Sequence, residues 1–251
     1  MSDSVVKTAR RIFEILEYFD EAQRPLSLRD FTRRHGYPPS SASAVLKSMV
    51  VLGYLDFDRD SRTYMPTMRI VELGAWVERA LFGEGSVIPL MNFVTRETQE
   101  TTSVATQSDL YMQYIHVVPS PQTIQFSITP GTIRPIARSG LGWLLLSARP
   151  DDGIEKLVRR INVEPSEERV DLPELMERIR EIRARGYVLS LHTVTAGAGV
   201  IGVLRPGRRN GRTLAIGVGG PVDRLVSQED QIVDTLRIGI ARYLLSDRGR
   251  D

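Results

Sequence analysis

The stretch SLRDFTRRHGYPPSSASAVLKSMVVLG, residues 27–53, carries the pattern that decides the fold of the first part of the chain. Ser27 stands three residues before Asp30, which is the spacing of a capping box and predicts the start of a helix. Gly36 is of the residue type that most often ends a helix, so this helix is expected to be short. The stretch therefore opens with a short helix and a glycine turn.

A second helix is predicted after this turn. Pro38 and Pro39 cannot continue the preceding helix, and Ser40 is expected to cap the new one. Its apolar residues recur every three or four positions, and the expected buried stripe is Ala42, Val45, Leu46, Met49 and Leu52. Residues 6–19 show the same periodicity, so three helices are predicted in this part of the chain.

A hairpin is predicted after the third helix. Residues 54–57 and 63–65 are strand-like, and the charged residues between them are typical of a turn. Helix, helix, glycine turn, helix and charged hairpin is the order of elements in a winged helix-turn-helix, whose last helix enters the major groove of DNA. We therefore predict a winged helix-turn-helix domain over residues 1–66.

The polar residues of this domain suit contact with double-stranded DNA. Short hydroxyl side chains beside a lysine can approach phosphates and base edges, and arginines can hold the DNA backbone. The expected DNA-contacting residues are Ser27, Arg29, Arg33, Arg34, Ser40, Ser41, Ser43, Lys47, Arg59 and Arg62. The alternative is that they are ordinary exposed residues of a helical bundle. The order of the elements, rather than any single residue, favours the DNA partner.

The composition narrows the class of protein. The 251 residues include 33 Lys plus Arg and 31 Asp plus Glu. This net charge of +2 excludes a strongly basic protein of the histone type. A count of zero cysteines excludes disulfides, thiol nucleophiles and Cys-based zinc sites, and the three histidines have no metal-ligand spacing. The longest uncharged apolar stretch, residues 139–148, is far short of the roughly 20 residues of a membrane span. We expect a cytoplasmic protein without metal, cofactor or membrane partner.

The second part of the chain mixes strand-like and helical patterns. Strands are predicted over residues 102–107, 111–118, 124–128, 187–191, 200–204 and 213–218. Helices are predicted over residues 140–148, 153–161, 172–185 and 228–245, and Asn210-Gly211 is expected to turn between the last two strands. These elements predict an α+β domain with an antiparallel sheet over residues 85–251, after a linker helix over residues 67–84.

The run GAGVIG at residues 197–202 matches the glycine spacing of a dinucleotide-binding motif, and Asp223 stands about 20 residues further on. That motif requires a helix that begins at the glycines. The residues that follow are β-branched and are then interrupted by Pro206, so we expect a strand here and no nucleotide. The glycines are instead expected to line a pocket or to permit close strand packing.

Several segments resemble those of the IclR family of bacterial transcriptional regulators. In the first part these are residues 36–41 (GYPPSS), Val45-Leu46, residues 52–55 (LGYL), Tyr64 and Leu73-Gly74. In the second part they are Gly131, Pro135 and residues 139–146, 182–187 and 217–221. The resemblance implies a ligand-responsive regulator of catabolic genes, a homodimer or dimer of dimers, with a GAF-like effector-binding domain. Pro39 and Ala44 replace basic residues usual in the family, so the base preference is expected to differ.

The resemblance also implies where a small organic acid would bind. The expected effector-binding residues are Tyr111, Arg138, Ser139, Gly140, Leu141, Trp143, Ser190, His192, Val200, Gly217 and Gly219. The last three stand where polar residues occur in similar proteins, which implies a wider and drier pocket.

Aromatic residues near these positions, among them Tyr114 and Phe126, lead to the hypothesis of an aromatic, hydroxybenzoate-like acid. Arg134, Arg138 or His192 is expected to bind its carboxylate. The alternative is that these aromatic and histidine residues belong to the hydrophobic core and do not contact a ligand.

Three alternatives remain open for the second domain. The effector is a small aliphatic keto acid such as glyoxylate or pyruvate, or the domain serves only oligomerisation. The third alternative is an enzyme that uses Ser139 or Ser190 with His192. The chain has no nucleophile elbow, zinc-protease motif or phosphate loop, so we expect no catalytic activity.

Overall fold

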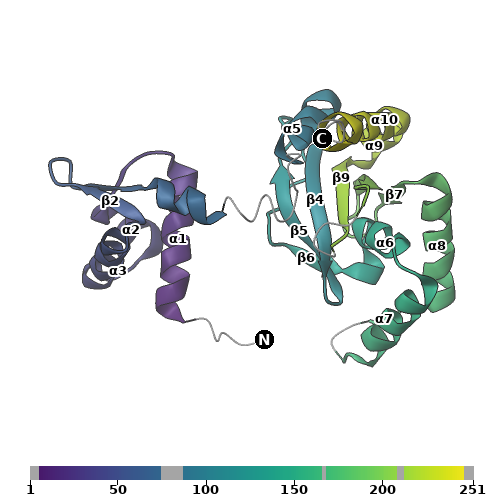
Figure 1. Ribbon diagram of the computed structural model, residues 1–251, viewed down its shortest axis with the longest axis horizontal. Helices are drawn as coiled ribbons and strands as arrows, with labels where there is room; N and C mark the ends of the chain where they lie inside the picture. The colour runs from purple at the N-terminus through teal and green to yellow at the C-terminus, as the bar shows by residue number, and fades with distance from the viewer. Residues whose placement is uncertain (1–5, 75–86, 166–167, 208–211, 246–251) are drawn as a thin grey trace, which may run out of the picture. The chain divides into compact units, whose positions relative to one another are not determined.

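The structure is a computed structural model that describes residues 6–74, 87–165, 168–207 and 212–245. The chain divides into two compact units, Met1–Glu78 and Arg79–Asp251 (Figure 1). None of the helices in the described ranges is long and apolar enough to cross a membrane. The predicted boundaries at residues 66/67 and 84/85 stay a prediction, and the second falls in residues 75–86, which lie outside the described ranges.

The first unit is a winged helix-turn-helix, as predicted. Its helices are α1 (Lys7–Ala22), α2 (Leu28–His35) and α3 (Pro39–Val51), and residues 68–74 are also helical. Its strands are β1 (Leu26–Ser27), β2 (Leu55–Asp58) and β3 (Thr63–Pro66), in the antiparallel order β1-β3-β2. The two-residue strand β1 was not predicted, because it is too short to show an alternating pattern.

Local signals explain where α2 begins and ends. Ser27 Oγ accepts from the backbone N–H of Asp30 at 3.4 Å, and Asp30 Oδ2 accepts from the backbone N–H of Ser27 at 2.8 Å, so the predicted capping box is present. Gly36 ends the helix with a φ of 66°, in the left-handed region that glycine adopts without strain.

The prediction for the start of α3 was wrong. The helix begins at Pro39 after Pro38, and no side chain caps it, so Ser40 lies in the first turn. Proline suits the first helical position because it has no N–H to satisfy and its φ already fits a helix. Leu52 was expected in the buried stripe but is 57% exposed, since it lies just beyond the last helical residue.

The second unit is a six-stranded sheet covered by helices on both faces (Figure 1). Its strands are β4 (Thr101–Ser108), β5 (Tyr111–Val118), β6 (Ile133–Pro135), β7 (Val188–Leu191), β8 (Ala198–Leu204) and β9 (Leu214–Pro221). Their order is β6-β5-β4-β9-β8-β7, and every neighbouring pair is antiparallel, which confirms the predicted antiparallel sheet.

The helices form the two outer layers. They are α5 (Val87–Thr98), α6 (Gly140–Ser147), α7 (Asp151–Val163), α8 (Leu172–Arg185), α9 (Val222–Ser227) and α10 (Glu229–Ile240). A short 3₁₀ helix, Ile136–Arg138, precedes α6, and one π-helical turn, Ala241–Leu245, follows α10. One buried apolar cluster lies between the sheet and α6, α7 and α8, and a second lies between the sheet and α5, α9 and α10.

One prediction for this unit was wrong. Residues 124–128 are not a strand, because the edge of β5 is paired with β6 instead and prolines flank the segment. The closing helix predicted over residues 228–245 is confirmed as α10 with the π-helical turn that follows it, and the separate helix α9 precedes it. The Asn210-Gly211 turn lies outside the described residues.

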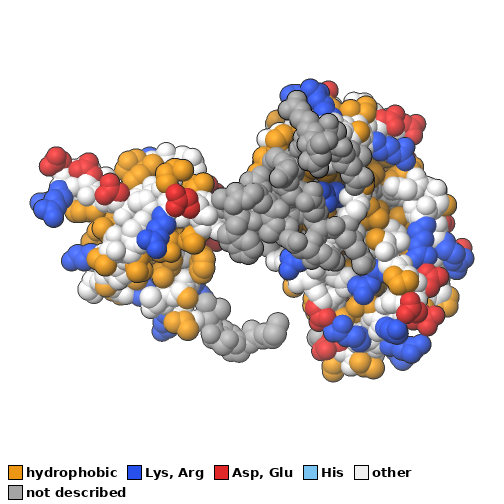
Figure 2. All heavy atoms as spheres, in the orientation of Figure 1, with side chains coloured by type: hydrophobic (Ala, Val, Ile, Leu, Met, Phe, Trp, Pro, Cys, Tyr) orange, Lys and Arg blue, Asp and Glu red, His pale blue; other side chains and the backbone are white. Residues whose placement is uncertain are grey.

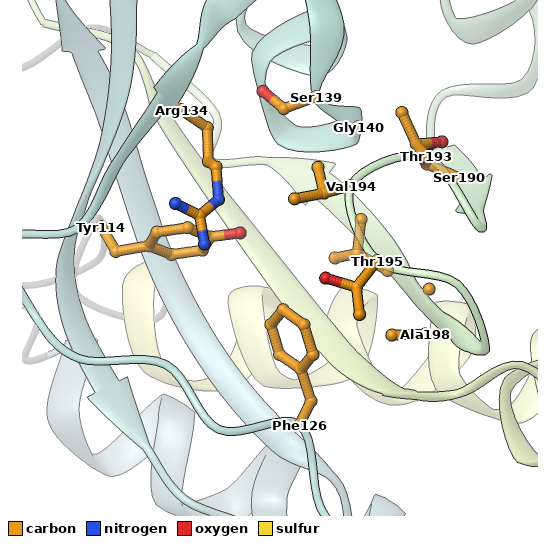
Figure 3. A pocket seen from close by; sticks show the side chains of 12 residues that line it. Tyr114, Phe126, Arg134, Ser139, Gly140, Ser190, Thr193, Val194, Thr195 and Ala198 are labelled. Carbon is orange, nitrogen blue, oxygen red and sulfur yellow. Dashed lines mark hydrogen bonds between the residues drawn. The ribbon is translucent and has the colours of Figure 1, made fainter.

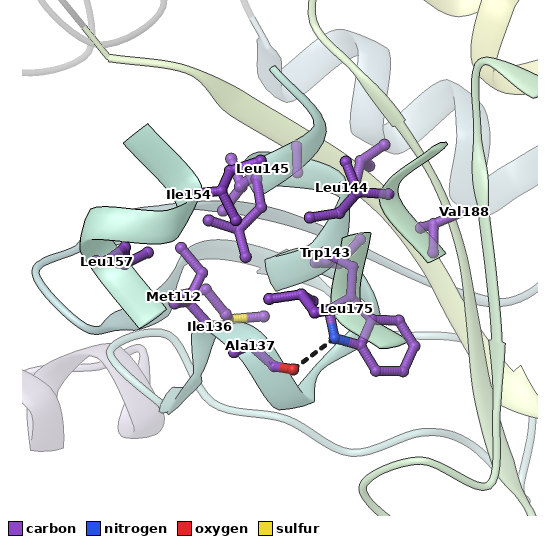
Figure 4. Packing of buried hydrophobic residues seen from close by; sticks show 14 of the residues in the cluster. Met112, Ile136, Ala137, Trp143, Leu144, Leu145, Ile154, Leu157, Leu175 and Val188 are labelled. Carbon is purple, nitrogen blue, oxygen red and sulfur yellow. Dashed lines mark hydrogen bonds between the residues drawn. The ribbon is translucent and has the colours of Figure 1, made fainter. Parts of the chain in front are cut away.

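Helix α6 packs directly onto the sheet. Residues 140–146 are all buried, and Gly202 on β8 permits this contact, since a Cβ there would lie 2.6 Å from Leu141 Cδ2. Trp143 Nε1 donates a hydrogen bond to the backbone oxygen of Ala137 at 2.7 Å (Figure 4). Trp143 and Leu141 are therefore part of the core, where the helix needs apolar side chains all round.

Candidate functional site

The exposed side of α3 is the first candidate surface. Ser40, Ala44 and Lys47 are exposed, and Ser43 is half-buried. Ser41 is also half-buried, and its hydroxyl accepts a hydrogen bond from the Arg11 guanidinium of α1. The structure thus leaves the side chains of Ser40 and Lys47 facing solvent, while Ser41 is held within the domain.

The arginines of α2 differ in their surroundings. Arg29 and Arg33 are exposed and form no ion pair with a described residue. Arg34 is paired with Glu21 at 2.8 Å and lies over the Tyr18 ring, with its Cζ 5.7 Å from the ring centroid. Ser27, expected to contact DNA, has its hydroxyl engaged in the capping box. Arg29 and Arg33 are therefore the two α2 arginines with free guanidinium groups.

The turn between β2 and β3 is held by Asp58. Its carboxylate accepts from Ser61 Oγ at 2.8 Å and from the backbone N–H of Asp60 at 2.9 Å. These bonds, the Ser61 bond first, lower the pKa of Asp58, so the turn carries a negative charge at neutral pH. Arg59 and Arg62 are exposed in the same turn, where acidic and basic side chains gather (Figure 2). The turn between β2 and β3 therefore presents two exposed arginines beside a carboxylate that is held in place.

The second candidate site is a small pocket at the N-terminal end of α6. It is lined by Tyr114, Phe126, Arg134, Ser139, Gly140, Ser190, Thr193, Val194, Thr195, Ala198, Gly199 and Val200 (Figure 3). The lining comes from β5, the segment after β5, β6, the start of α6, and β7 and β8 with the loop that joins them. The cavity volume is about 30 Å³, which is space for water molecules rather than for a large ligand.

Four of the expected effector-binding residues line this pocket, namely Ser139, Gly140, Ser190 and Val200. The structure does not bring the others there. Leu141, Trp143 and Tyr111 pack in or against the core, and His192 is exposed in the loop after β7. Arg138 lies in a separate groove, where it is paired with Glu168 at 2.8 Å and donates to the Arg169 backbone oxygen at 2.7 Å.

The expected widening of the pocket at Gly217 and Gly219 was wrong. A Cβ on Gly219 would lie 2.6 Å from Phe126 Cδ1, and a Cβ on Gly217 would lie 2.8 Å from Leu141 Cδ2. Neighbouring side chains therefore already occupy the space that the glycines leave, and the ring of Phe126 points into the pocket (Figure 3).

Arg134 supplies the charge of the pocket. Among its described lining residues there is no other ionised side chain, and Arg134 makes no ion pair with a described residue. Its Nη1 donates to the Ile133 backbone oxygen at 3.1 Å, which leaves most of its N–H groups available. Arg134 lies beside Tyr114, whose hydroxyl points into the pocket (Figure 3). Burial raises the pKa of Tyr114 to about 12, so the phenol stays neutral and can donate a hydrogen bond.

The start of α6 adds further donors. The first N–H groups of a helix have no acceptor within the helix and attract anions. Ser139 does not cap α6, because its hydroxyl donates to the Pro135 backbone oxygen at 3.0 Å. Gly140 is required here, since a Cβ would lie 2.5 Å from Ser190 Cβ. This end of the helix therefore sits directly on the pocket floor formed by Ser190 and Val200.

The hydroxyls and the imidazole proposed for an enzyme are not arranged as a nucleophile and its base. Ser190 Oγ shares a hydrogen bond with Thr193 Oγ1 at 2.7 Å, and His192 Nδ1 accepts from the Gly197 backbone N–H at 3.1 Å. The GAGVIG run opens no helix, as predicted. Gly197 precedes β8, the other residues of the run lie on this strand, and Gly199 lines the pocket.

Four lining residues were not predicted, and one of them, Ala198, begins β8. Thr193, Val194 and Thr195 lie in the loop between β7 and β8. Their signal in the sequence was a threonine-rich segment between two strands, directly before Gly197. Loops that close over a scaffold are where ligand contacts concentrate, so this segment could have been named.

Family models and curated relatives match both units. The model described as "IclR helix-turn-helix domain" matches residues 8–59, and "Bacterial transcriptional regulator IclR C-terminal" matches residues 85–241. The chain is 24% identical over 184 residues to HTH-type transcriptional regulator KdgR of Escherichia coli, covering 72% of this chain and 70% of that protein. It is 24% identical over 241 residues to HTH-type transcriptional regulator BhcR of Paracoccus denitrificans, covering 92% of this chain and 85% of that protein.

Solved structures agree with these matches. The effector domain of the transcriptional regulator IclR from Acinetobacter sp. ADP1 matches with a TM-score of 0.60 and 31% identity. The match covers 69% of this chain and 99% of that chain. The IclR of Thermotoga maritima shares the fold, with a TM-score of 0.65, 18% identity and coverage of 94% of this chain and 98% of that chain. The chain therefore belongs to the IclR family of bacterial transcriptional regulators, with an N-terminal DNA-binding domain and a C-terminal effector domain.

Proposed function

We propose that the pocket beside α6 binds a small organic acid and that this ligand changes the binding of operator DNA. The observation that carries the proposal is Arg134, the one ionised side chain among the described lining residues, with no acidic partner among them. A carboxylate would gain charge-assisted hydrogen bonds from its guanidinium. The Tyr114 hydroxyl and the first N–H groups of α6 would supply further donors.

The size of the pocket supports an aliphatic acid over the hydroxybenzoate-like acid suggested by the sequence. A cavity of about 30 Å³ lacks room for a benzene ring unless a lining side chain moves. A keto acid of the size of glyoxylate or pyruvate requires a smaller adjustment. The hydroxyl group of Thr195, which lines the pocket, suits its carbonyl oxygen better than an aromatic face.

We propose that the DNA-binding form is a homodimer or a dimer of dimers that controls catabolic genes. Two copies of α3 would then enter successive major grooves about 34 Å apart. Ser40, Ser43 and Lys47 would contact bases and phosphates from α3, with Arg29, Arg33, Arg59 and Arg62 on the DNA backbone. An effector that binds one arrangement of the copies better than another would shift the population of the DNA-binding form.

The test begins with DNA selected by the full chain from a random pool. Fluorescence anisotropy of this DNA is then measured while glyoxylate, pyruvate, benzoate or 4-hydroxybenzoate is added. We expect an aliphatic keto acid to change the affinity for DNA, and Arg134→Gln to remove that response without removing DNA binding. Arg159→Gln is the matched control, because Arg159 is exposed on α7 outside the pocket.

An unchanged DNA affinity with every acid would support the alternative that the second domain only oligomerises. An effector response that survives in Arg134→Gln would contradict the assigned carboxylate site. Transcript profiling of a deletion strain tests the catabolic targets, since the genes of acid breakdown should change most.

A further inference from the structure

The ring of Phe126 fills part of the space in the pocket. This ring packs against the bare backbone of Gly219, because a Cβ there would lie 2.6 Å from Phe126 Cδ1 and 3.2 Å from Cε1. The ring points toward the Tyr114 side of the cavity and lies below the loop that carries Thr195 (Figure 3). The remaining cavity of about 30 Å³ is therefore what the phenylalanine ring leaves free.

The backbone that carries this ring is fixed, although residues 119–132 form neither helix nor strand. The Phe126 backbone oxygen accepts from Thr101 Oγ1 at 2.8 Å, and Thr101 is almost fully buried. Two residues earlier, the Ile124 backbone oxygen accepts from Arg224 Nη2 at 2.8 Å. Because the backbone is held on both sides of position 125, the size of the side chain at position 126 decides how much space the ligand has.

We propose that Phe126 is the specificity-determining residue of the pocket and restricts it to aliphatic acids by standing where an aromatic ring would bind. This inference rests on the proposed function of the pocket. Gly219 allows the ring of Phe126 to take this position, since any side chain at residue 219 would collide with the ring. Arg134 binds the carboxylate that both classes of acid share, and Phe126 separates the classes by volume.

The chemistry predicts how the selectivity changes. Truncation of Phe126 to alanine removes one benzene ring from the wall of the pocket, so the space gained matches the ring of benzoate. Apolar cavities of this origin accept benzene, which shows that ring-sized space alone suffices for binding. One methylene group in an apolar pocket changes discrimination about 10- to 200-fold, so a change of at least about tenfold is expected for a whole ring.

The experiment uses isothermal titration of the full chain with pyruvate and with benzoate. The variants are Phe126→Ala, the graded variant Phe126→Val, and the control Ile124→Ala, whose side chain is 72% exposed on the same segment. We expect the wild type and the control to favour pyruvate. The ratio of benzoate to pyruvate affinity should rise at least about tenfold in Phe126→Ala and less in Phe126→Val. A wild type that binds benzoate as tightly as pyruvate, or an unchanged ratio in both variants, overturns the inference while the acid site itself stands.

A second probe separates this inference from the proposed function. Benzene carries no carboxylate, so its binding does not depend on Arg134. Saturating benzene should raise the melting temperature of Phe126→Ala and leave that of the wild type and of Ile124→Ala unchanged. If neither acid binds any variant, the proposed function fails. The benzene result then still decides whether Phe126 fills a ring-sized space, and no stabilisation of Phe126→Ala would overturn that assignment.

Discussion

The buried carboxylate of Glu100 accepts hydrogen bonds from both Nε and Nη2 of Arg224, the latter at 3.0 Å. Glu100, which is 1% exposed, lies between α5 and β4, and Arg224 lies on α9. The Glu100 hydrogen bond raises the pKa of the Arg224 guanidinium, so the guanidinium stays ionised. Arg224 also donates to the Ile124 backbone oxygen. One guanidinium therefore joins three segments of the second domain, including the one that carries Phe126.

Replacement of Arg224 by alanine is expected to destabilise the second domain by about 3 kcal/mol, because it leaves the buried Glu100 carboxylate without its partner. Urea denaturation of the full chain measures the change. The control is Arg159→Ala, whose ion pair with Glu155 is exposed and should be worth less than about 1 kcal/mol. Equal losses in the two variants would contradict the structural role of Arg224.

The capping box of α2 is expected to depend on pH. The Ser27 hydroxyl and then its backbone N–H donate to Asp30 and lower the pKa of that carboxyl below its ordinary value of 3.8. A lowered folded-state pKa contributes stability that is present above the unfolded value and is lost as pH falls through the folded value. Ser27→Ala should therefore cost about 1 kcal/mol at pH 7, and the cost should shrink below pH 4.

Urea titrations of the wild type and Ser27→Ala at several pH values between 7 and 3 measure this difference in the free energy of unfolding. Unfolding is followed by the loss of the helical signal. Ser48→Ala is the matched control, since Ser48 is exposed on α3 and donates only to the Ala44 backbone oxygen. A difference between Ser27→Ala and the wild type that grows toward pH 3 would have the wrong sign for this capping box.

Lys47 is expected to contact a DNA phosphate. It is exposed on α3 and makes no ion pair with a described residue. Lys47→Ala should weaken binding of all DNA sequences alike and lower the salt slope, log K against log salt, by about 1 per protomer. Anisotropy titrations from 50 to 200 mM salt measure the slope. Lys156→Ala on α7 of the second unit should leave it unchanged, and an unchanged slope in Lys47→Ala would refute the phosphate contact.

His192 is expected to hold the loop that closes the pocket. It has a φ of 57°, which is strained for a residue other than glycine, and its Nδ1 accepts from the Gly197 N–H. His192→Ala loses this acceptor and should weaken effector binding about fivefold, the equivalent of about 1 kcal/mol. His192→Asn should restore part of the affinity, because asparagine tolerates this φ and has an acceptor. Isothermal titration with pyruvate measures both variants, and an identical affinity in His192→Ala would remove the loop from the site.

Helices with local signals were predicted well from the sequence. The Ser27–Asp30 spacing and Gly36 define α2 through contacts between near neighbours in the chain. Strands depend on a distant partner, so residues 124–128 were expected to be a strand although β6 takes their place beside β5. The pocket was predicted only in part for the same reason. Ser139, Gly140, Ser190 and Val200 line it, while Arg138 and His192 point elsewhere.

By itself the sequence determined the winged helix-turn-helix, the α+β second domain and the resemblance to the regulator family, because periodicity, caps and glycine turns are local properties. Only the tertiary structure decided which arginine faces the pocket. Arg134 lies on β6, and the 3₁₀ helix that follows carries Arg138 to another groove. Only the tertiary structure placed the ring of Phe126 over Gly219. Such contacts join segments that are far apart in the chain, and their packing, not the residue types, decides how much space remains for a ligand.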